Sequence, residues 1–185
     1  MTSPTLAEKV VGVHRALDAG GVAHAFGGAL ALAYLTEEVR ATKDIDVNVF
    51  VTVGEVDRVL IALPSEVTRT SEDAGAVRRD AQVRLWWDHT PLDLFFDVDD
   101  IHREAALHAR TVPFADTEIP VLDGTELTVF KMMFARPKDW VDIQEMLHAG
   151  TVDVPAVETA FARIMGRDHE ALARLRELAD ATDKA

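Results

Sequence analysis

The segment 44–51 constrains the fold of this chain more than any other. It reads Asp-Ile-Asp-Val-Asn-Val-Phe-Val, so polar and apolar side chains alternate over its first six residues. An alternation with a period of two predicts a half-buried β-strand. Because successive side chains point to opposite faces of a strand, Asp44 and Asp46 are expected on one face and the apolar residues on the other. The sequence therefore predicts a sheet that packs one face against a core and gathers two carboxylates on the other.

The patterns around this strand predict an α/β fold of the α+β kind. The expected helices are 6–19, 29–35, 56–63, 127–134, 140–148, 154–165 and 169–181, and the expected strands are 22–26, 83–87 and 92–96, the last two joined by the turn 88–91. We expect a small mixed sheet with flanking helices over residues 1–120. A helical bundle over residues 121–185 is expected to share one cleft with it.

Composition narrows the possible functions. The chain has no cysteine, which excludes disulfides and thiolate metal sites, and its histidines lack the spacing of a helical zinc pair. Its 19 Lys and Arg against 32 Asp and Glu give a net charge of −13, which disfavours binding to extended polyanions. No apolar stretch at the N-terminus suits a signal peptide or a membrane span. We therefore expect a cytoplasmic protein with no membrane partner.

The paired carboxylates suit a metal ion that carries a phosphate. Two ionised carboxylates side by side repel each other, and a cation resolves that repulsion. Mg²⁺ takes oxygen ligands and completes its shell with water and substrate phosphate, with Mn²⁺ as an alternative ion. Asp93 interrupts the apolar strand 92–96, where an unpaired charge is costly to bury, so a third metal-facing carboxylate accounts for it. The competing interpretation is that these aspartates are simply exposed residues of edge strands.

A glycine pair, Gly27 and Gly28, stands at the predicted turn from strand 22–26 into helix 29–35. Without side chains, its backbone N–H groups and the helix N-terminus can approach phosphate oxygens. The pair is therefore a candidate for substrate binding, and an ordinary tight turn is the alternative.

These motifs together resemble a known family. The glycine pair followed by segment 40–47, Arg-Ala-Thr-Lys-Asp-Ile-Asp-Val, resembles the signature of DNA polymerase β-type nucleotidyltransferases. The sixteen-residue step from Gly28 to Asp44 is similar to that of the AbiEii-type toxin and related bacterial nucleotidyltransferases. Segment 130–143, with its Lys…Arg-x-Lys-Asp-x-x-Asp-Ile pattern, resembles a second stretch of that group. The resemblance implies a polymerase β-like core and a nucleotidyltransferase enzyme.

The resemblance also implies roles for individual residues. Asp44 and Asp46 bind the metal, and Asp93 completes the metal site or activates the acceptor hydroxyl. Lys131 contacts the triphosphate; a lysine that only reaches past the apolar stripe of its helix into water is the alternative.

Four further residues are secondary candidates for substrate binding. Arg40 and Thr42 could orient phosphate or support the carboxylates, and could equally be a surface ion-pair partner and a strand residue. Asp139 and Asp142 lie at the start of predicted helix 140–148, where an aspartate is often only a cap or a dipole partner.

The expected reaction moves a nucleoside monophosphate from a nucleoside triphosphate such as ATP to an acceptor hydroxyl. The resemblance implies a tRNA or protein acceptor, as in toxins that have an antitoxin partner. Small antibiotics of the aminoglycoside or lincosamide type are the alternative acceptors, and they suit an acidic protein. For tRNA, the arginines at 69, 78, 79 and 84 are expected to supply a basic patch. A non-catalytic nucleotide-binding or antitoxin-like protein is a third possibility.

Overall fold

The computed structural model describes residues 3–182 and 184, and within them the chain forms two compact units. The sheet unit consists of Met1–Leu30 and Arg40–Leu122. The helical unit consists of Ala31–Val39 and Asp123–Ala185. No helix within the described residues is long and apolar enough to cross a membrane. The predicted division of the chain at residue 120 and the predicted shared cleft both stay predictions.

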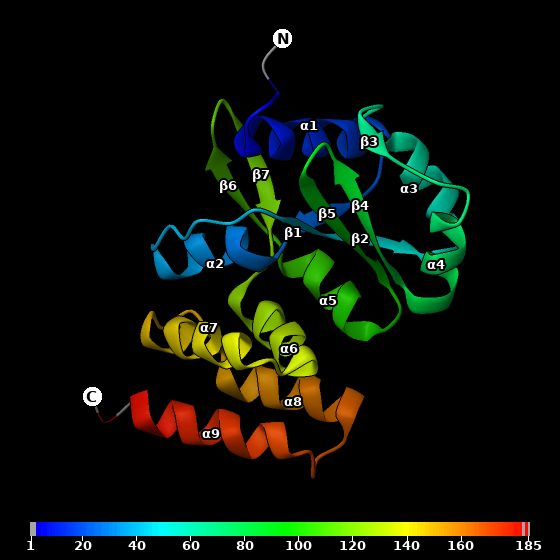
Figure 1. Ribbon diagram of the computed structural model, residues 1–185. Coiled ribbons are helices and arrows are strands. Elements are labelled where there is room, and N and C mark those ends of the chain that lie inside the picture. The colour runs from blue at the N-terminus through cyan, green and yellow to red at the C-terminus, as the bar shows by residue number, and fades with distance from the viewer. Residues whose placement is uncertain (1–2, 183, 185) are drawn as a thin grey trace. The chain divides into compact units, whose positions relative to one another are not determined.

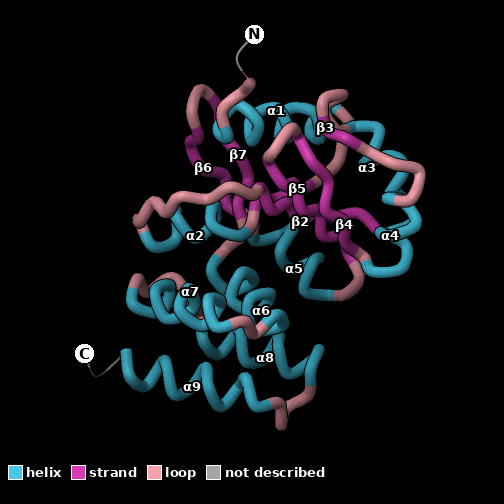
Figure 2. Tube along the Cα trace, viewed as in Figure 1, coloured by secondary structure: helices cyan, strands magenta, loops and turns pink. Residues whose placement is uncertain are grey.

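One mixed sheet forms the centre of the sheet unit (Figures 1 and 2). Its strand order is β3-β4-β5-β2-β1-β7-β6. The strands are β1 (His24–Phe26), β2 (Ile45–Thr52), β3 (Val67–Thr68), β4 (Gln82–Trp87), β5 (Thr90–Asp97), β6 (Arg110–Phe114) and β7 (Thr117–Val121). Strand β2 runs parallel to β5 and antiparallel to β1. The expected mixed α/β class is confirmed.

Helices flank the sheet within this unit. They are α1 (Leu6–Ala19), α3 (Val56–Ala62), α4 (Asp73–Asp80) and α5 (Asp100–His108), with the short 3₁₀ turn η1 (Val53–Glu55) before α3. In Figure 1, α1 lies above the strands and α5 below them. Helix α1 begins where predicted because Thr5 caps it: the hydroxyl of Thr5 accepts from the Glu8 N–H, and the Glu8 carboxylate accepts from the Thr5 N–H at 2.7 Å.

The two faces of β2 differ as the sequence predicts. Val47 and Val49 are fully buried, and they pair with Leu94 and Phe96 of β5, which are buried on the same face. Asp46, which directly precedes Val47, is only half-buried and points to the opposite face. The apolar face packs towards α1, where a side chain at Gly12 would run into the ring of Trp87.

One aromatic departs from the expected pattern. Adjacent aromatics in alternating strands, here Trp86, Trp87, Phe95 and Phe96, are expected to pack as core on both sides of a sheet, but the Trp86 residue is 45% exposed. It lies on the same face of β4 as Arg84, whereas Trp87 alternates to the buried face. The expectation was wrong for Trp86, because only the face of β4 that carries Leu85 and Trp87 is buried.

The helical unit contains the predicted C-terminal helices. They are α6 (Gly124–Phe134), α7 (Pro137–His148), α8 (Val154–Met165) and α9 (Glu170–Thr182), while α2 runs from Gly28 to Thr36. The carboxylates of Asp123 and Asp153 cap α6 and α8 by accepting from backbone N–H groups of their first turns. Apolar residues of α6 to α9 pack together inside the unit; the fully buried ones include Val129, Ile143, Val157, Phe161 and Leu175.

Candidate active site

Two of the predicted carboxylates are neighbours across two strands. Asp46 on β2 and Asp93 on β5 are register partners in the parallel pair, and paired residues project from the same face of a sheet. Asp44 immediately precedes β2 and is two residues from Asp46, so it belongs to the same face. All three residues are half-buried. The structure thus brings the three sequence-predicted aspartates to one region of the sheet.

An arginine that the sequence did not assign to this region completes the row. Arg84 on β4 is the register partner of Asp93. Its guanidinium donates through Nε to Oδ1 and through Nη2 to Oδ2 of Asp93, both at 2.7 Å. The Asp93 side chain is only 14% exposed, whereas the Arg84 side chain is 55% exposed. Arg84, Asp93 and Asp46 therefore lie side by side across β4, β5 and β2.

The charges of the carboxylate row act on the pKa of Arg84. Its pKa is raised, first by the hydrogen bonds to Asp93, then by the charge of Asp93, and further by the charges of Asp44 and Asp46. Burial acts in the opposite direction, and its effect is smaller than those of Asp93 but larger than those of Asp44 and Asp46. The guanidinium therefore stays charged and acts as the counter-ion of the carboxylates.

Thr42 supports the first carboxylate. Its hydroxyl donates to Asp44 Oδ1 at 2.6 Å, and the Asp44 N–H lies 3.4 Å from the same hydroxyl oxygen. This is the carboxylate-supporting role that the sequence left open for Thr42. Arg40 is exposed on the segment that leads into β2, and its phosphate-binding role stays a prediction.

The glycine pair makes room for Asp46. Gly28 has φ +53°, and a Cβ at that position would overlap the carboxylate of Asp46. The Gly27 N–H donates to the Asp46 carbonyl at 2.9 Å, so that donor is already used within the sheet unit. Without side chains, both glycines let their backbone lie close to Asp46. Phosphate binding at the start of α2 stays a prediction.

A magnesium ion fits the chemistry of these residues. Their donors are all carboxylate oxygens, the ligands that Mg²⁺ prefers, and the Asp46 carboxylate occupies the space that a side chain at Gly28 would fill. Within residues 3–182 and 184, however, no three His, Cys, Asp or Glu side chains are arranged to hold a metal. The carboxylate of Asp93 accepts from the Arg84 guanidinium, and the carboxylate of Asp44 accepts from the Thr42 hydroxyl. The metal site stays a prediction.

The remaining candidates meet in the helical unit. Lys131 on α6 donates to Asp142 on α7 at 2.6 Å, and its Nζ lies 3.8 Å from Asp139. Asp139 is fully buried and accepts from the Arg136 backbone N–H at 3.1 Å and from the Arg136 side chain at 2.7 and 3.1 Å. Asp139 thus serves as the cap of α7, the alternative that the sequence left open. Any contact of Lys131, Asp139 or Asp142 with substrate stays a prediction.

The ionisation of Asp139 follows from these contacts. Burial favours its neutral form, but the hydrogen bonds and charge of Arg136 and the charge of Lys131 outweigh that effect. The pKa of Asp139 is therefore lowered from its ordinary value. The carboxylate is held ionised inside a cluster of two cations.

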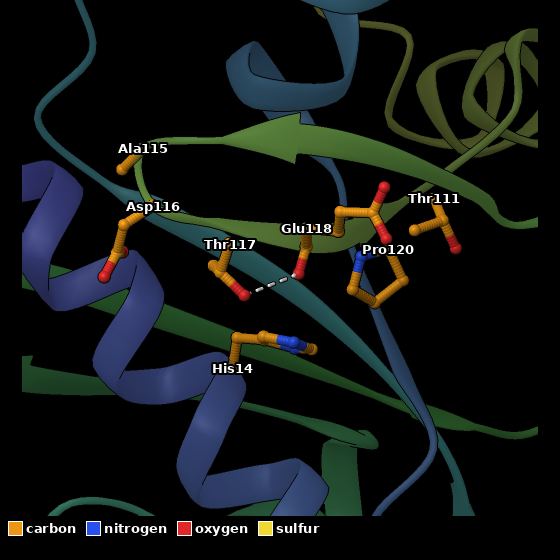
Figure 3. Close-up of a pocket in the computed structure, with 7 residues that line it drawn as sticks. All are labelled: His14, Thr111, Ala115, Asp116, Thr117, Glu118 and Pro120. Atoms are coloured by element: carbon orange, nitrogen blue, oxygen red, sulfur yellow. Dashed lines mark hydrogen bonds between the residues drawn. The ribbon is translucent and has the colours of Figure 1, made fainter.

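An open hollow of about 860 Å³ lies elsewhere in the sheet unit, between α1 and the β6–β7 hairpin (Figure 3). It is lined by His14, Thr111, Ala115, Asp116, Thr117, Glu118 and Pro120. None of the predicted site residues lines it. We place the candidate site at the carboxylate row, because the sequence-predicted aspartates meet there and none of them lines the hollow.

No protein-family model matches the sequence, and the curated proteins give no significant match. The solution structure of the antibiotic-resistance factor ANT(2'')-Ia is similar to this chain with a TM-score of 0.58 and 14% identity, over 97% of each chain. An antigenic nucleotidyltransferase-like protein from Paracoccidioides brasiliensis gives a TM-score of 0.56 and 17% identity, over 95% of this chain and 91% of its own.

A third structure extends this set. The lincosamide antibiotic adenylyltransferase LnuA, in its lincomycin-bound form, gives a TM-score of 0.53 and 13% identity, over 78% of this chain and 98% of its own. Likeness at such low identity establishes the fold alone, so the expected membership of the AbiEii-type group stays a prediction. The chain has the nucleotidyltransferase fold, as the resemblance of its sequence implies.

Proposed function

We propose that this protein is a metal-dependent nucleotidyltransferase that moves a nucleoside monophosphate from a nucleoside triphosphate to an acceptor hydroxyl. The observation that carries the proposal is the register pairing of Asp46 with Asp93, with Asp44 beside them. Carboxylates on neighbouring strands of a nucleotidyltransferase fold are suited to a metal–triphosphate complex.

The proposed step is an in-line displacement. The acceptor oxygen forms a bond to the α-phosphorus, the bond from that phosphorus to the bridging oxygen of the β-phosphate breaks, and pyrophosphate leaves. Asp44, Asp46 and Asp93 would hold the metal, Thr42 fixes Asp44, and Asp93 also receives the hydroxyl proton. Mg²⁺, when bound, offsets the charge of the triphosphate and of the leaving pyrophosphate.

The acceptor is proposed to be a small cationic hydroxyl compound. The arginines expected to form a basic patch for tRNA already have partners: Arg78 pairs with Asp57 at 2.6 Å, Arg79 with Asp80 at 2.8 Å, and Arg84 with Asp93. Arg69 donates to the backbone carbonyls of residues 60, 64 and 67. With a net charge of −13, the protein attracts cations more readily than polyanions.

The structural neighbours agree with this choice of acceptor class. Two of them are an antibiotic-resistance factor and a lincosamide adenylyltransferase. A toxin-like transfer to tRNA or protein, and a non-catalytic nucleotide-binding or antitoxin-like role, are kept as outcomes of the test.

The test incubates the pure protein with Mg²⁺ or Mn²⁺, each α-labelled nucleoside triphosphate, and separate pools of aminoglycosides, lincosamides, tRNA and cell protein. We expect label in a small-molecule pool. Label in tRNA or protein would assign the toxin-like alternative instead. Nucleotide binding without transfer to any pool would contradict the catalytic proposal and favour the non-catalytic one.

A further inference from the structure

The Arg84–Asp93 pair bears directly on how a metal reaches the carboxylate row. Asp93 is a proposed metal ligand, yet both of its oxygens accept hydrogen bonds from one guanidinium at 2.7 Å. We propose that Arg84 is a built-in competitor for the metal at Asp93, so that the site stays closed to the ion until a triphosphate arrives and draws the guanidinium away. This inference rests on the proposed function and adds a regulatory device to its site.

Geometry makes the competition direct. A planar guanidinium that donates two parallel hydrogen bonds to a carboxylate matches both oxygens at once. A Mg²⁺ ligated by one of those oxygens would lie about 2.0–2.1 Å from it, within a few ångströms of the guanidinium. Two cations so close on a carboxylate that is only 14% exposed repel each other with little screening. Metal and Arg84 therefore exclude each other at Asp93.

The charge of the row explains why an arginine stands there. Asp44, Asp46 and Asp93 lie together on one face, and without a cation they repel each other. Arg84 supplies the missing positive charge from the next strand, β4. Arg84 thus already offsets part of the charge of the row, and a metal at Asp93 would have to replace this counter-ion.

Because the Arg84 side chain is exposed, a bound triphosphate can reach it as a second partner. Its side chain is 55% exposed, so it can leave Asp93 without unpacking the core, which lies on the opposite face of β4. A triphosphate that enters with its metal brings several anionic oxygens, and guanidinium groups bind phosphate in the same two-pronged way. Exchange of Arg84 from Asp93 to phosphate would couple metal binding to nucleotide binding.

The test measures Mn²⁺ binding to the nucleotide-free protein by electron paramagnetic resonance at one fixed pH. Arg84→Gln removes both the charge and the fork, and Arg84→Lys keeps the charge but cannot form the fork. We expect both variants to bind Mn²⁺ more tightly than the wild type, Arg84→Gln by about tenfold, the factor set by loss of a charge-assisted bond. Arg79→Gln, which breaks an exposed pair with Asp80, is the matched control and should leave affinity unchanged.

A non-reactive triphosphate analogue provides the second arm. It should tighten Mn²⁺ binding in the wild type much more than in Arg84→Gln, because only the wild type has an arginine to displace. Equal Mn²⁺ affinity in all proteins, or weaker binding in Arg84→Gln, would overturn the competition. An Arg84→Lys variant that binds like the wild type would overturn the role of the fork.

Asp46→Asn separates this inference from the proposed function. If Mn²⁺ binding depends on Asp46 but is the same with and without Arg84, the competition fails and the metal site stands. If the wild type and Arg84→Gln, both shown to be folded by circular dichroism, bind no Mn²⁺ even with the analogue, both proposals fail.

Discussion

At the scale of single residues, hairpin register decides which side chains share the site. The sequence predicts a four-residue turn, 88–91, which would pair Trp87 with Leu92 and place Arg84 opposite Phe95. The structure has a two-residue turn, pairs Trp87 with Thr90, and so places Arg84 opposite Asp93. Loop length fixes register in a hairpin. The residue types around Pro91 did not reveal that this loop has two residues rather than four. The three aspartates were predictable because each lies in or beside a strand with its own periodicity.

Gly28 gives a prediction at this scale. Gly28→Ala should destabilise the protein by about 1–3 kcal/mol and weaken metal binding, because φ is +53° and the new Cβ would overlap the Asp46 carboxylate. Urea denaturation measures the first effect and Mn²⁺ titration the second. Gly75→Ala on α4 is the control, since a Cβ there meets nothing within 4 Å, and it should be neutral or stabilising. Equal stability of the two variants would contradict the close fit at Gly28.

Asp139 gives a pH-dependent prediction. Its pKa is lower in the folded state, so its ionised form contributes stability above the unfolded pKa of about 3.9, and that contribution is lost as pH falls through the folded value. At pH 7, Asp139→Asn should therefore unfold at a lower urea concentration than the wild type, and its free energy of unfolding should be smaller by about 1–3 kcal/mol. The difference should shrink when both are measured below pH 3.9. A difference that stays constant between these pH values would show that Asp139 is not ionised in the folded protein.

At the scale of elements, regular periodicity separates what the sequence predicts from what it misses. Strand β2, helix α1 and helices α6 to α9 were predicted because long apolar periods and caps mark them. The sequence did not predict β6 and β7, which contain Pro113 and Pro120. Proline normally argues against a strand and is tolerated at an edge such as β6. Helix α4 was missed because Val77 is its one buried residue, so it has no apolar stripe.

The contact between α1 and the β4–β5 turn gives a prediction at this scale. The buried Lys9 of α1 donates to the Trp87 carbonyl at 2.9 Å and to the Thr90 hydroxyl at 3.0 Å, and pairs with Asp88 at 3.3 Å. Lys9→Met keeps the apolar stem but removes these bonds, so it should cost about 1–3 kcal/mol of unfolding free energy. Urea denaturation measures this loss. Lys138→Met, at an exposed position of α7, should change stability little, and a similar loss in both variants would contradict a specific role for Lys9.

At the scale of the whole molecule, charge and fold favour the same class of chemistry. The net charge of −13 leaves the protein with an excess of carboxylates. Three of them stand on one face of the sheet in a nucleotidyltransferase fold. The acceptor class could not be derived from the sequence, because the choice between tRNA and a small cation rests on which arginines already have partners. That pairing, seen at residues 57 and 78 and at residues 84 and 93, is set by how helices and strands pack and by the register of the β4–β5 hairpin.

The most direct test of the central claim compares pyrophosphate release and label transfer by the wild type, Asp46→Asn and Asp93→Asn, with Asp116→Asn as control. Asp116 forms an exposed pair with Arg15 away from the carboxylate row. All variants should remain folded, because the changed side chains are not fully buried. We predict that the wild type and Asp116→Asn transfer nucleotide and that Asp46→Asn and Asp93→Asn lose transfer by more than about a hundredfold. Transfer at the wild-type rate by folded Asp46→Asn and Asp93→Asn would contradict the account.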